Sequence, residues 1–335
     1  MRYFSIFLVN VFQTLPFVLA AFLATKYSAA AVFVVVLALA SVTLIAFVNR
    51  TGLPRTGAKN ASPYPKLLVA LFSAISACAW VAHVELLGAF GSLITIIAAL
   101  VGGLIALAGA SQFLRAPQNQ TPSRVRLSAA AVCMISAVAL MIDPELIRLS
   151  RTLASFSWGD GMRVVVLIAG IGALNILRPM LCHPQEALSR GNQPLETTVT
   201  VLIETFSACL CLVALNLWRD GGSEMVLVAQ TLISPAHWSA AELAIIWVGI
   251  ANTAIGLVWL AQATNVAGVA TALTFNQVRP AVAYAMQVFA GLTVFTWSGV
   301  VKVTIASILL LASLHLVKVI PATTDARHTN DRHGL

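Results

Sequence analysis

Charged side chains are scarce in this 335-residue sequence, where aspartate, glutamate, lysine and arginine together make up 10%. A soluble globular domain carries about 25% of such residues, whereas hydrophobic residues here reach 59%. This composition cannot cover a water-soluble surface. The apolar runs are about 20 residues long, which is typical of membrane-spanning helices and too long for the alternating strands of a barrel. We therefore expect an all-α integral membrane protein that lies in a lipid bilayer.

Motifs of catalysis and of metal binding are also missing. The sequence has no G-x-S-x-G, no HExxH and no P-loop, and no two carboxylates are spaced for acid–base work. None of its five cysteines forms a C-x-x-C pair, and His183 with Glu186 offers too few ligands for a metal. We predict no enzyme, no cofactor and no metal site. The net charge of +8 is assigned to cytoplasmic loops and not to nucleic-acid binding.

Ten apolar segments follow one another without an intervening soluble domain. They are expected over residues 4–24, 28–48, 67–86, 89–113, 127–142, 162–180, 198–217, 241–261, 267–289 and 298–320. Ten spans can be divided into two units of five, and because five is odd, the two units would enter the membrane in opposite orientations. The predicted fold is ten transmembrane helices in two inverted five-helix repeats.

A short internal echo supports this division. Residues 79–83 read AWVAH and residues 258–262 read VWLAQ, both within the third span of a unit, and the same offset pairs Ser92 with Thr271. We predict four regions in chain order: a first repeat, an outer linker, a second repeat and a disordered cytoplasmic tail. Their boundaries are residues 1–146, 147–160, 161–320 and 321–335.

Lysine and arginine in the loops predict the orientation. With the N-terminus inside, thirteen of them lie on the cytoplasmic side and six on the outer side, and one, Arg279, lies within a span. Because positive loops remain in the cytoplasm, we expect a multi-pass protein of the inner (plasma) membrane with both termini cytoplasmic.

Polar side chains within the spans are the candidate functional residues, since such groups in hydrocarbon usually face a cavity or a partner. The ninth span places Asn276, Gln277, Arg279 and Tyr284 on one face. That face either lines a passage or makes hydrogen bonds between helices. Arg279 requires an anion, which is either Glu204 of the seventh span or a negative group on the cargo.

Other polar and aromatic residues complete the predicted pathway. Trp80 and Trp259 are the tryptophans of the repeated segment, for which plain packing is the alternative. The full set expected to face the pathway is Gln13, Trp80, Glu204, Asn252, Trp259, Asn276, Gln277, Arg279 and Tyr284. His83 and Glu85 are left out, because residues two apart on a helix point about 200° apart and a position near the membrane surface explains both.

One region resembles a known family. The segments 259–263 (WLAQA) and 278–282 (VRPAV), with Gly268 and Thr271 between them, are similar to the third-to-fourth-span region of a repeat in the drug/metabolite transporter superfamily, EamA type. The first half matches more loosely and has Val-Gly-Gly at 101–103 in place of the mid-span proline. The chain is identified as a divergent member.

The resemblance implies ten helices and a central cavity lined by the first, third, fourth, sixth, eighth and ninth spans. It also implies alternating access and the export or exchange of small metabolites, with protons as a candidate coupling ion. We therefore predict a secondary transporter of small polar or amphipathic metabolites, most simply an exporter. The alternatives are a flippase for lipid-linked cargo and, from another class, a membrane enzyme acting on lipid. Whether the protein is a monomer or a homodimer stays open.

Overall fold

The computed structural model consists of helices joined by turns, with no strand among the residues that it describes. These residues are 2–23, 26–51, 64–90, 124–141, 157–172, 197–267, 282, 285–286, 288–289 and 295–317. The expected fourth and ninth spans lie almost wholly outside them, as do most of the linker and the whole tail.

Seven helices fall where the sequence predicts spans. They are α1 (Arg2–Leu23), α2 (Ala29–Thr51), α3 (Tyr64–Phe90), α5 (Arg124–Met141), α7 (Trp158–Gly172), α10 (Thr197–Asp220) and α16 (Trp297–Val317). The expected eighth span is one continuous helical rod in three parts: α12 (Ala240–Trp247), the π-helix η5 (Val248–Ile255) and α13 (Gly256–Ala267).

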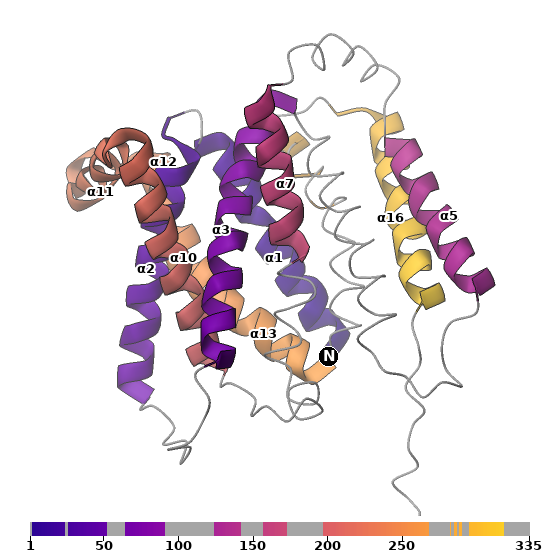
Figure 1. Ribbon diagram of the computed structural model, residues 1–335, viewed down its shortest axis with the longest axis horizontal. Helices are drawn as coiled ribbons and strands as arrows, with labels where there is room; N and C mark the ends of the chain where they lie inside the picture. Colours follow the sequence, from indigo (N-terminus) through magenta and orange to yellow (C-terminus); the bar gives the residue numbers. More distant parts are fainter. Residues whose placement is uncertain are drawn as a thin grey trace, which may run out of the picture.

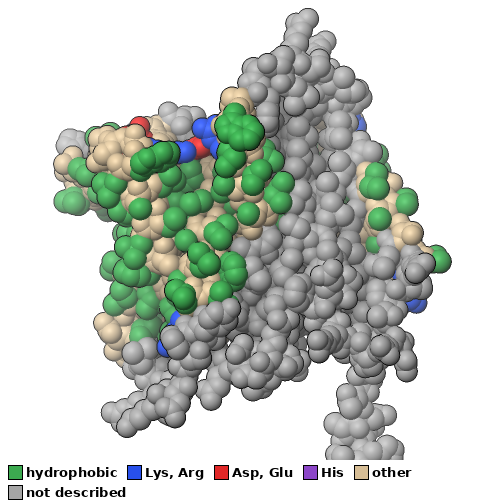
Figure 2. Space-filling model, in the orientation of Figure 1, with side chains coloured by type: hydrophobic (Ala, Val, Ile, Leu, Met, Phe, Trp, Pro, Cys, Tyr) green, Lys and Arg blue, Asp and Glu red, His purple; other side chains and the backbone are tan. Residues whose placement is uncertain are grey.

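Among the described residues, four helical stretches are long and apolar enough to cross a membrane. They are Ala29–Arg50, Lys66–Leu86, Thr197–Asp220 and Ala240–Ala263. Large apolar side chains are exposed along the outside of the bundle, among them Val42, Phe47, Phe206 and Leu210, and Figure 2 shows hydrophobic atoms over much of its described face. An apolar exterior of this kind suits lipid and not water. The all-helical membrane class predicted from the composition is therefore supported by the described helices.

Two pairs of helices pack against each other in the same way. α1 lies along α13, with Ser5 beside Trp259 and Gln13 beside Asn252, so the two helices are antiparallel. α7 lies along α3 and is also antiparallel, because Arg163 near its start meets Glu85 while the later Gly170 meets Ser76.

The remaining described helices connect these two pairs. α2 packs on α10 in antiparallel fashion, since Val34 meets Cys209 and Leu44 meets Val201. Residues 29–37 of α2 are all buried, which makes this helix the core of the bundle. α5 and α16 lie side by side at the right of Figure 1.

Contacts along the rods also give their relative directions. α3 and α10 are parallel, with Glu85 beside Arg219 and Cys78 beside Cys211. α2 and the α12–η5–α13 rod are parallel as well, because Lys26 just before α2 meets Glu242 while Leu39 lies against Gly249. The ends of α3 and α10 and the starts of α2, α7 and α12 therefore lie at one end of the bundle. The loop charges predict that this end faces outward, and we call it the outer end.

Two features were not predicted. The segment between α10 and α12, expected to be a loop, contains the helix α11 (Ser223–Ile233) and a short 3-10 turn, η4 (Pro235–His237). The chain turns from α10 into α11 at Gly221 and Gly222, whose φ angles of 68° and 82° favour glycine. The second feature is the π-helical stretch in the middle of the eighth span.

Candidate functional site

Two buried amides join α1 to the π-helix near the middle of both elements. The Gln13 Nε2 donates to the backbone carbonyl of Asn252 at 3.0 Å, and the Asn252 Nδ2 donates back to the carbonyl of Phe12. Gln13 is 6% exposed and Asn252 is 1% exposed. We call this reciprocal pair the amide clamp. In this conformation each side-chain amide donates one hydrogen bond to the neighbouring helix. In a membrane, such a bond typically stabilises the packing of two helices by about 1 kcal/mol.

The local backbone explains why the amide clamp forms here. A π-helix makes i→i+5 hydrogen bonds, holds an extra residue per turn, and occurs frequently at functional sites. Gly256 follows directly, and a Cβ at this position would lie 2.4 Å from the Gln13 Nε2. On another side of the rod, a Cβ on Gly249 would lie 2.9 Å from the Leu39 Cβ. These two glycines let α1 and α2 approach the rod closely.

Aromatic rings flank the amide clamp on both sides. The Phe12 ring lies 5.3 Å from the Trp247 ring in an edge-on arrangement and 6.4 Å from the Trp259 ring. The Trp259 Nε1 donates to the Ser5 Oγ at 3.0 Å. The site therefore combines neutral hydrogen-bonding groups with aromatic surface, which suits polar or amphipathic molecules without requiring a fixed charge.

Glu204 lies on a helix that packs against the same rod. It is 8% exposed, and it follows Val201 by about one turn of α10. Val201 packs with Ala254 and Leu257 of the rod. A buried carboxyl group thus lies within a candidate membrane span, near the half of the rod that carries the site.

The structure brings together three of the predicted pathway residues: Gln13, Asn252 and Trp259. Trp80 packs against an apolar cluster, with its ring 5.9 Å from that of Phe33. The four predicted residues of the ninth span lie outside the described residues, and so does any pairing of one of them with Glu204. They are Asn276, Gln277, Arg279 and Tyr284.

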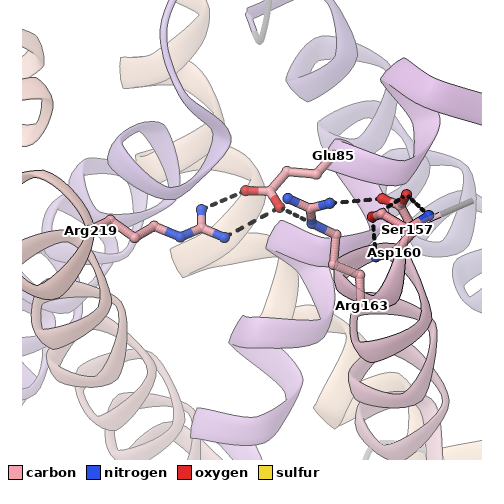
Figure 3. A network of polar contacts seen from close by, with 5 residues as sticks. All are labelled: Glu85, Ser157, Asp160, Arg163 and Arg219. Carbon is pink, nitrogen blue, oxygen red and sulfur yellow. Dashed lines mark hydrogen bonds and ion pairs between the residues drawn. The ribbon is translucent and has the colours of Figure 1, made fainter. Parts of the chain in front are cut away.

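An ion-pair cluster that was not predicted lies at the outer end (Figure 3). Both carboxylate oxygens of Glu85 form ion pairs with arginines. Arg163 Nε lies 2.8 Å from Glu85 Oε2, and Arg219 Nη1 lies 2.6 Å from Glu85 Oε1. Arg163 also contacts Asp160 at 2.8 Å, whose carboxylate is held by the Ser157 backbone and hydroxyl. We call these residues the Glu85 cluster. His83, two residues before Glu85, is 7% exposed and is therefore buried within the bundle.

A second cluster at the same end surrounds Glu242 at the start of α12. Ser239 and Glu242 form a capping box, and the second carboxylate oxygen accepts from Lys26 Nζ at 2.6 Å and from Tyr27 Oη at 2.5 Å. We call these four residues the Glu242 cluster. The Glu242 side chain is 1% exposed, and its hydrogen bond raises the pKa of the Lys26 ammonium above its ordinary value.

The sequence did contain a signal for one of these clusters. The spacing S-x-x-E at 239–242 is a capping-box motif, and it marks both the start of α12 and a carboxylate held at the membrane edge. No such signal exists for Glu85, because its partners come from helices far away in the sequence.

The described cysteines behave as small apolar residues. Cys78, Cys133, Cys209 and Cys211 are free and half-buried, as expected from their place in the apolar spans. The Sγ atoms of Cys78 and Cys211 lie 3.6 Å apart. Within the described part of the chain, no three histidine, cysteine, aspartate or glutamate residues lie close enough together to hold a metal ion.

Comparison with known proteins adds a likeness in fold. No family model and no curated protein matches the sequence. The chain is similar to a solved crystal structure, described only as a protein, with a TM-score of 0.53 and 15% sequence identity. The match covers 95% of this chain and 99% of that one. At this identity the likeness shows a shared fold and carries no information on function.

Proposed function

We propose that the protein is a secondary transporter of small polar or amphipathic metabolites, and specifically an exporter of the inner membrane, with both termini cytoplasmic. It would be built from ten helices in two inverted five-helix repeats, as the resemblance to EamA-type drug/metabolite transporters implies. The amide clamp, which joins the first repeat to the second at membrane depth, is the observation that carries this proposal.

The helix directions support the inverted repeat. If the repeats correspond, α1 matches α7, α2 matches α10, and α3 matches the α12–η5–α13 rod. Under this correspondence, the contact of α1 with the rod has its counterpart in the contact of α7 with α3. The contact of α2 with α10 is its own counterpart. The contacts also make the two members of each pair run in opposite directions. This is the packing expected of two copies related by an axis in the membrane plane.

The chemistry of the site supports a pathway for cargo. A π-helical turn within a spanning rod leaves backbone groups that are easily rearranged, and the amide clamp is made of hydrogen bonds that can be exchanged for bonds to a ligand. Phe12, Trp247 and Trp259 would supply stacking surface. Alternating access would separate α1 from the rod at this point and make the amides available to the cargo.

Efflux from reconstituted vesicles tests the function and identifies the cargo in the same experiment. Proteoliposomes are loaded with a mixture of metabolites, and mass spectrometry identifies the species that leave faster than from protein-free vesicles. We expect a small set of chemically related species with the wild type and loss of their efflux with Asn252→Leu. Asn216→Leu is the matched control, because this amide is 2% exposed but donates within its own helix, to the Leu212 carbonyl at 2.8 Å.

Two outcomes would contradict the proposal. In the first, no species leaves the wild-type vesicles faster than the protein-free ones. In the second, Asn252→Leu and Asn216→Leu reduce efflux equally, which would show that any buried amide matters and that the amide clamp has no special role.

A second variant tests the charged residue of the ninth span. We expect Arg279→Ala to abolish efflux while expression remains close to that of the wild type, because the guanidinium would hold a negative group of the cargo or fix Glu204. Efflux at the wild-type rate by this variant would remove Arg279 from the pathway.

A further inference from the structure

The Glu85 cluster joins three helices that belong to different halves of the predicted inverted repeat. α3 corresponds to the first half, whereas α7 and α10 correspond to the second. In Figure 3 the two arginines approach the Glu85 carboxylate from opposite sides, one from α7 and one from α10. Two acidic and two basic side chains meet here, so the cluster is balanced in charge. Any movement that separates the halves at the outer end must break these ion pairs.

Its partial exposure makes the Glu85 cluster easy to break. The side chains of Glu85, Arg163 and Arg219 are 22%, 40% and 36% exposed, so water can replace each partner as the ion pair separates. Ion pairs at such a boundary contribute little individually. The Glu242 cluster differs, because its carboxylate is buried and caps a helix, and an uncompensated charge there would be costly.

We propose that the Glu85 cluster is the outer gate of the transport pathway, and that the Glu242 cluster remains closed and holds the α1–α2 turn to α12 throughout the cycle. This inference rests on the proposed transport function. The conformation described here is then closed to the outside. Opening moves the outer ends of α7 and α10 away from α3, and the released arginines are solvated at the membrane surface.

Two native thiols lie beneath the gate and can report its state. Cys78 precedes Glu85 on α3, and Cys211 precedes Arg219 on α10, each by about two turns. Their Sγ atoms are 3.6 Å apart. If the Glu85 cluster is the outer gate, a water-soluble reagent added from outside reaches these half-buried thiols faster when the ion pairs above them open.

The test measures labelling of Cys78 in intact cells with a charged, membrane-impermeant methanethiosulfonate. The full-length chain is used with its other four cysteines replaced by alanine. We expect labelling to be about two- to thirtyfold faster with Glu85→Gln, the range expected from the loss of two partly exposed ion pairs. Glu224→Gln is the matched control, because this exposed glutamate lies at the start of α11 on the same side of the bundle. It should label at the parental rate.

Arg219→Gln is the second variant, because it breaks one of the same ion pairs and keeps the proposal testable if Glu85→Gln fails to fold. Both variants are checked by their melting temperature in detergent. Unchanged labelling in a variant that melts as a folded protein would overturn the gate. Faster labelling in Glu224→Gln would also overturn it, because the effect would then follow surface charge alone.

Disulfide trapping gives an independent readout of the same gate. In a chain that keeps only Cys78 and Cys211, copper phenanthroline with oxygen as the oxidant removes two electrons and two protons from the thiols and joins the sulfurs. We expect rapid trapping with the wild-type gate and slower trapping with Glu85→Gln. Equal trapping rates would contradict the gate.

The two proposals can fail separately. If Glu85→Gln speeds the labelling of Cys78 but no metabolite leaves the vesicles, the opening of the Glu85 cluster is supported and the transport function is contradicted. If efflux is observed but Glu85→Gln leaves the labelling rate of Cys78 unchanged, the transport function is supported and this gate is contradicted.

Discussion

The α1–rod interface and the α7–α3 interface have the same antiparallel geometry but opposite chemistry. At the α1–rod interface, the amide clamp joins the helices through hydrogen bonds near the middle of α1 and of η5. At the α7–α3 interface, the backbones come very close, since a Cβ on Gly170 would lie 2.2 Å from the Ala79 Cβ. The Glu85 cluster then connects α3 and α7 at their outer ends.

This difference indicates where each interface can move. Close packing around Gly170 tolerates little sliding, because interiors at this density do not deform continuously. Hydrogen bonds between amides can instead be exchanged for others at small cost. The α1–rod interface is therefore suited to rearrange along its length. The α7–α3 interface is suited to pivot about the Gly170 contact, so that it separates only at its outer end, where the partly exposed ion pairs lie.

The largest effect on stability is expected at the close contact. Gly170→Ala places a methyl group against Ala79 and within 3.2 Å of the Ile75 carbonyl oxygen, which should destabilise the fold by about 1–3 kcal/mol. Thermal unfolding in detergent measures this loss of stability. Gly159→Ala on the same helix is the control, because its nearest neighbour is the Ser157 Oγ at 3.5 Å. Ala79→Gly should restore part of the loss, and a wild-type melting temperature for Gly170→Ala would refute the close packing.

A smaller effect is expected at the amide clamp. Gln13→Leu and Asn252→Leu each remove an interhelical hydrogen bond, and bonds of this kind contribute about 0.6–1.7 kcal/mol in membranes. A double-mutant cycle on the free energy of unfolding should give a coupling energy of about 1 kcal/mol. The same cycle with Gln13 and Asn216 serves as the control and should give none. Additive losses at Gln13 and Asn252 would mean that the two amides act independently.

A still smaller effect should follow from the Glu85 cluster. Glu85→Gln is expected to lower the free energy of unfolding by about 0.2–1 kcal/mol per ion pair lost, the range for partly exposed pairs. The wild type should lose this advantage when salt is raised, because exposed charges are screened. A loss of stability that does not depend on ionic strength would argue that Glu85 acts through packing instead.

The smallest effect concerns Lys26 and pH. Its pKa is raised in the folded protein by the hydrogen bond to Glu242. The stabilisation is therefore complete below the unfolded value of about 10.4 and is lost as pH rises through the higher folded value. Melting temperatures of the wild type should fall over this alkaline range more steeply than those of Lys26→Arg, whose charge persists. Parallel alkaline profiles for the two proteins would contradict the role of Lys26.

The sequence predicted the positions of the helices well and the contacts between them poorly. Long apolar runs located seven of the described helices, each with its start within four residues of the predicted one, because burying about 20 apolar residues in lipid leaves few alternatives. Gln13 and Asn252 were recognised as polar groups within spans, but their mutual contact was not, since it depends on which helices are neighbours. Glu85 was set aside as a residue near the membrane surface. Its ion partners on α7 and α10 were missed, because pairing across such separations leaves no local pattern.

The π-helix was missed for a different reason. Residues 248–255 (VGIANTAI) have the same apolar character as an ordinary spanning helix, so hydropathy cannot separate the two. The distinction depends on the fit of Gly249 to α2 and of Gly256 to α1, which only the packed bundle supplies.

The extra residue in this π-helix also sets the rotational register of everything that follows it. Trp247 and Trp259 are twelve residues apart, and in a regular α-helix that interval leaves the second ring about 120° away from the first. Accommodating one additional residue removes about 100° of that rotation, so both indoles can face Phe12. Deleting one residue within 248–255 would convert this stretch to a regular α-helix and turn Trp259 away from α1, even though no contacting side chain had been changed.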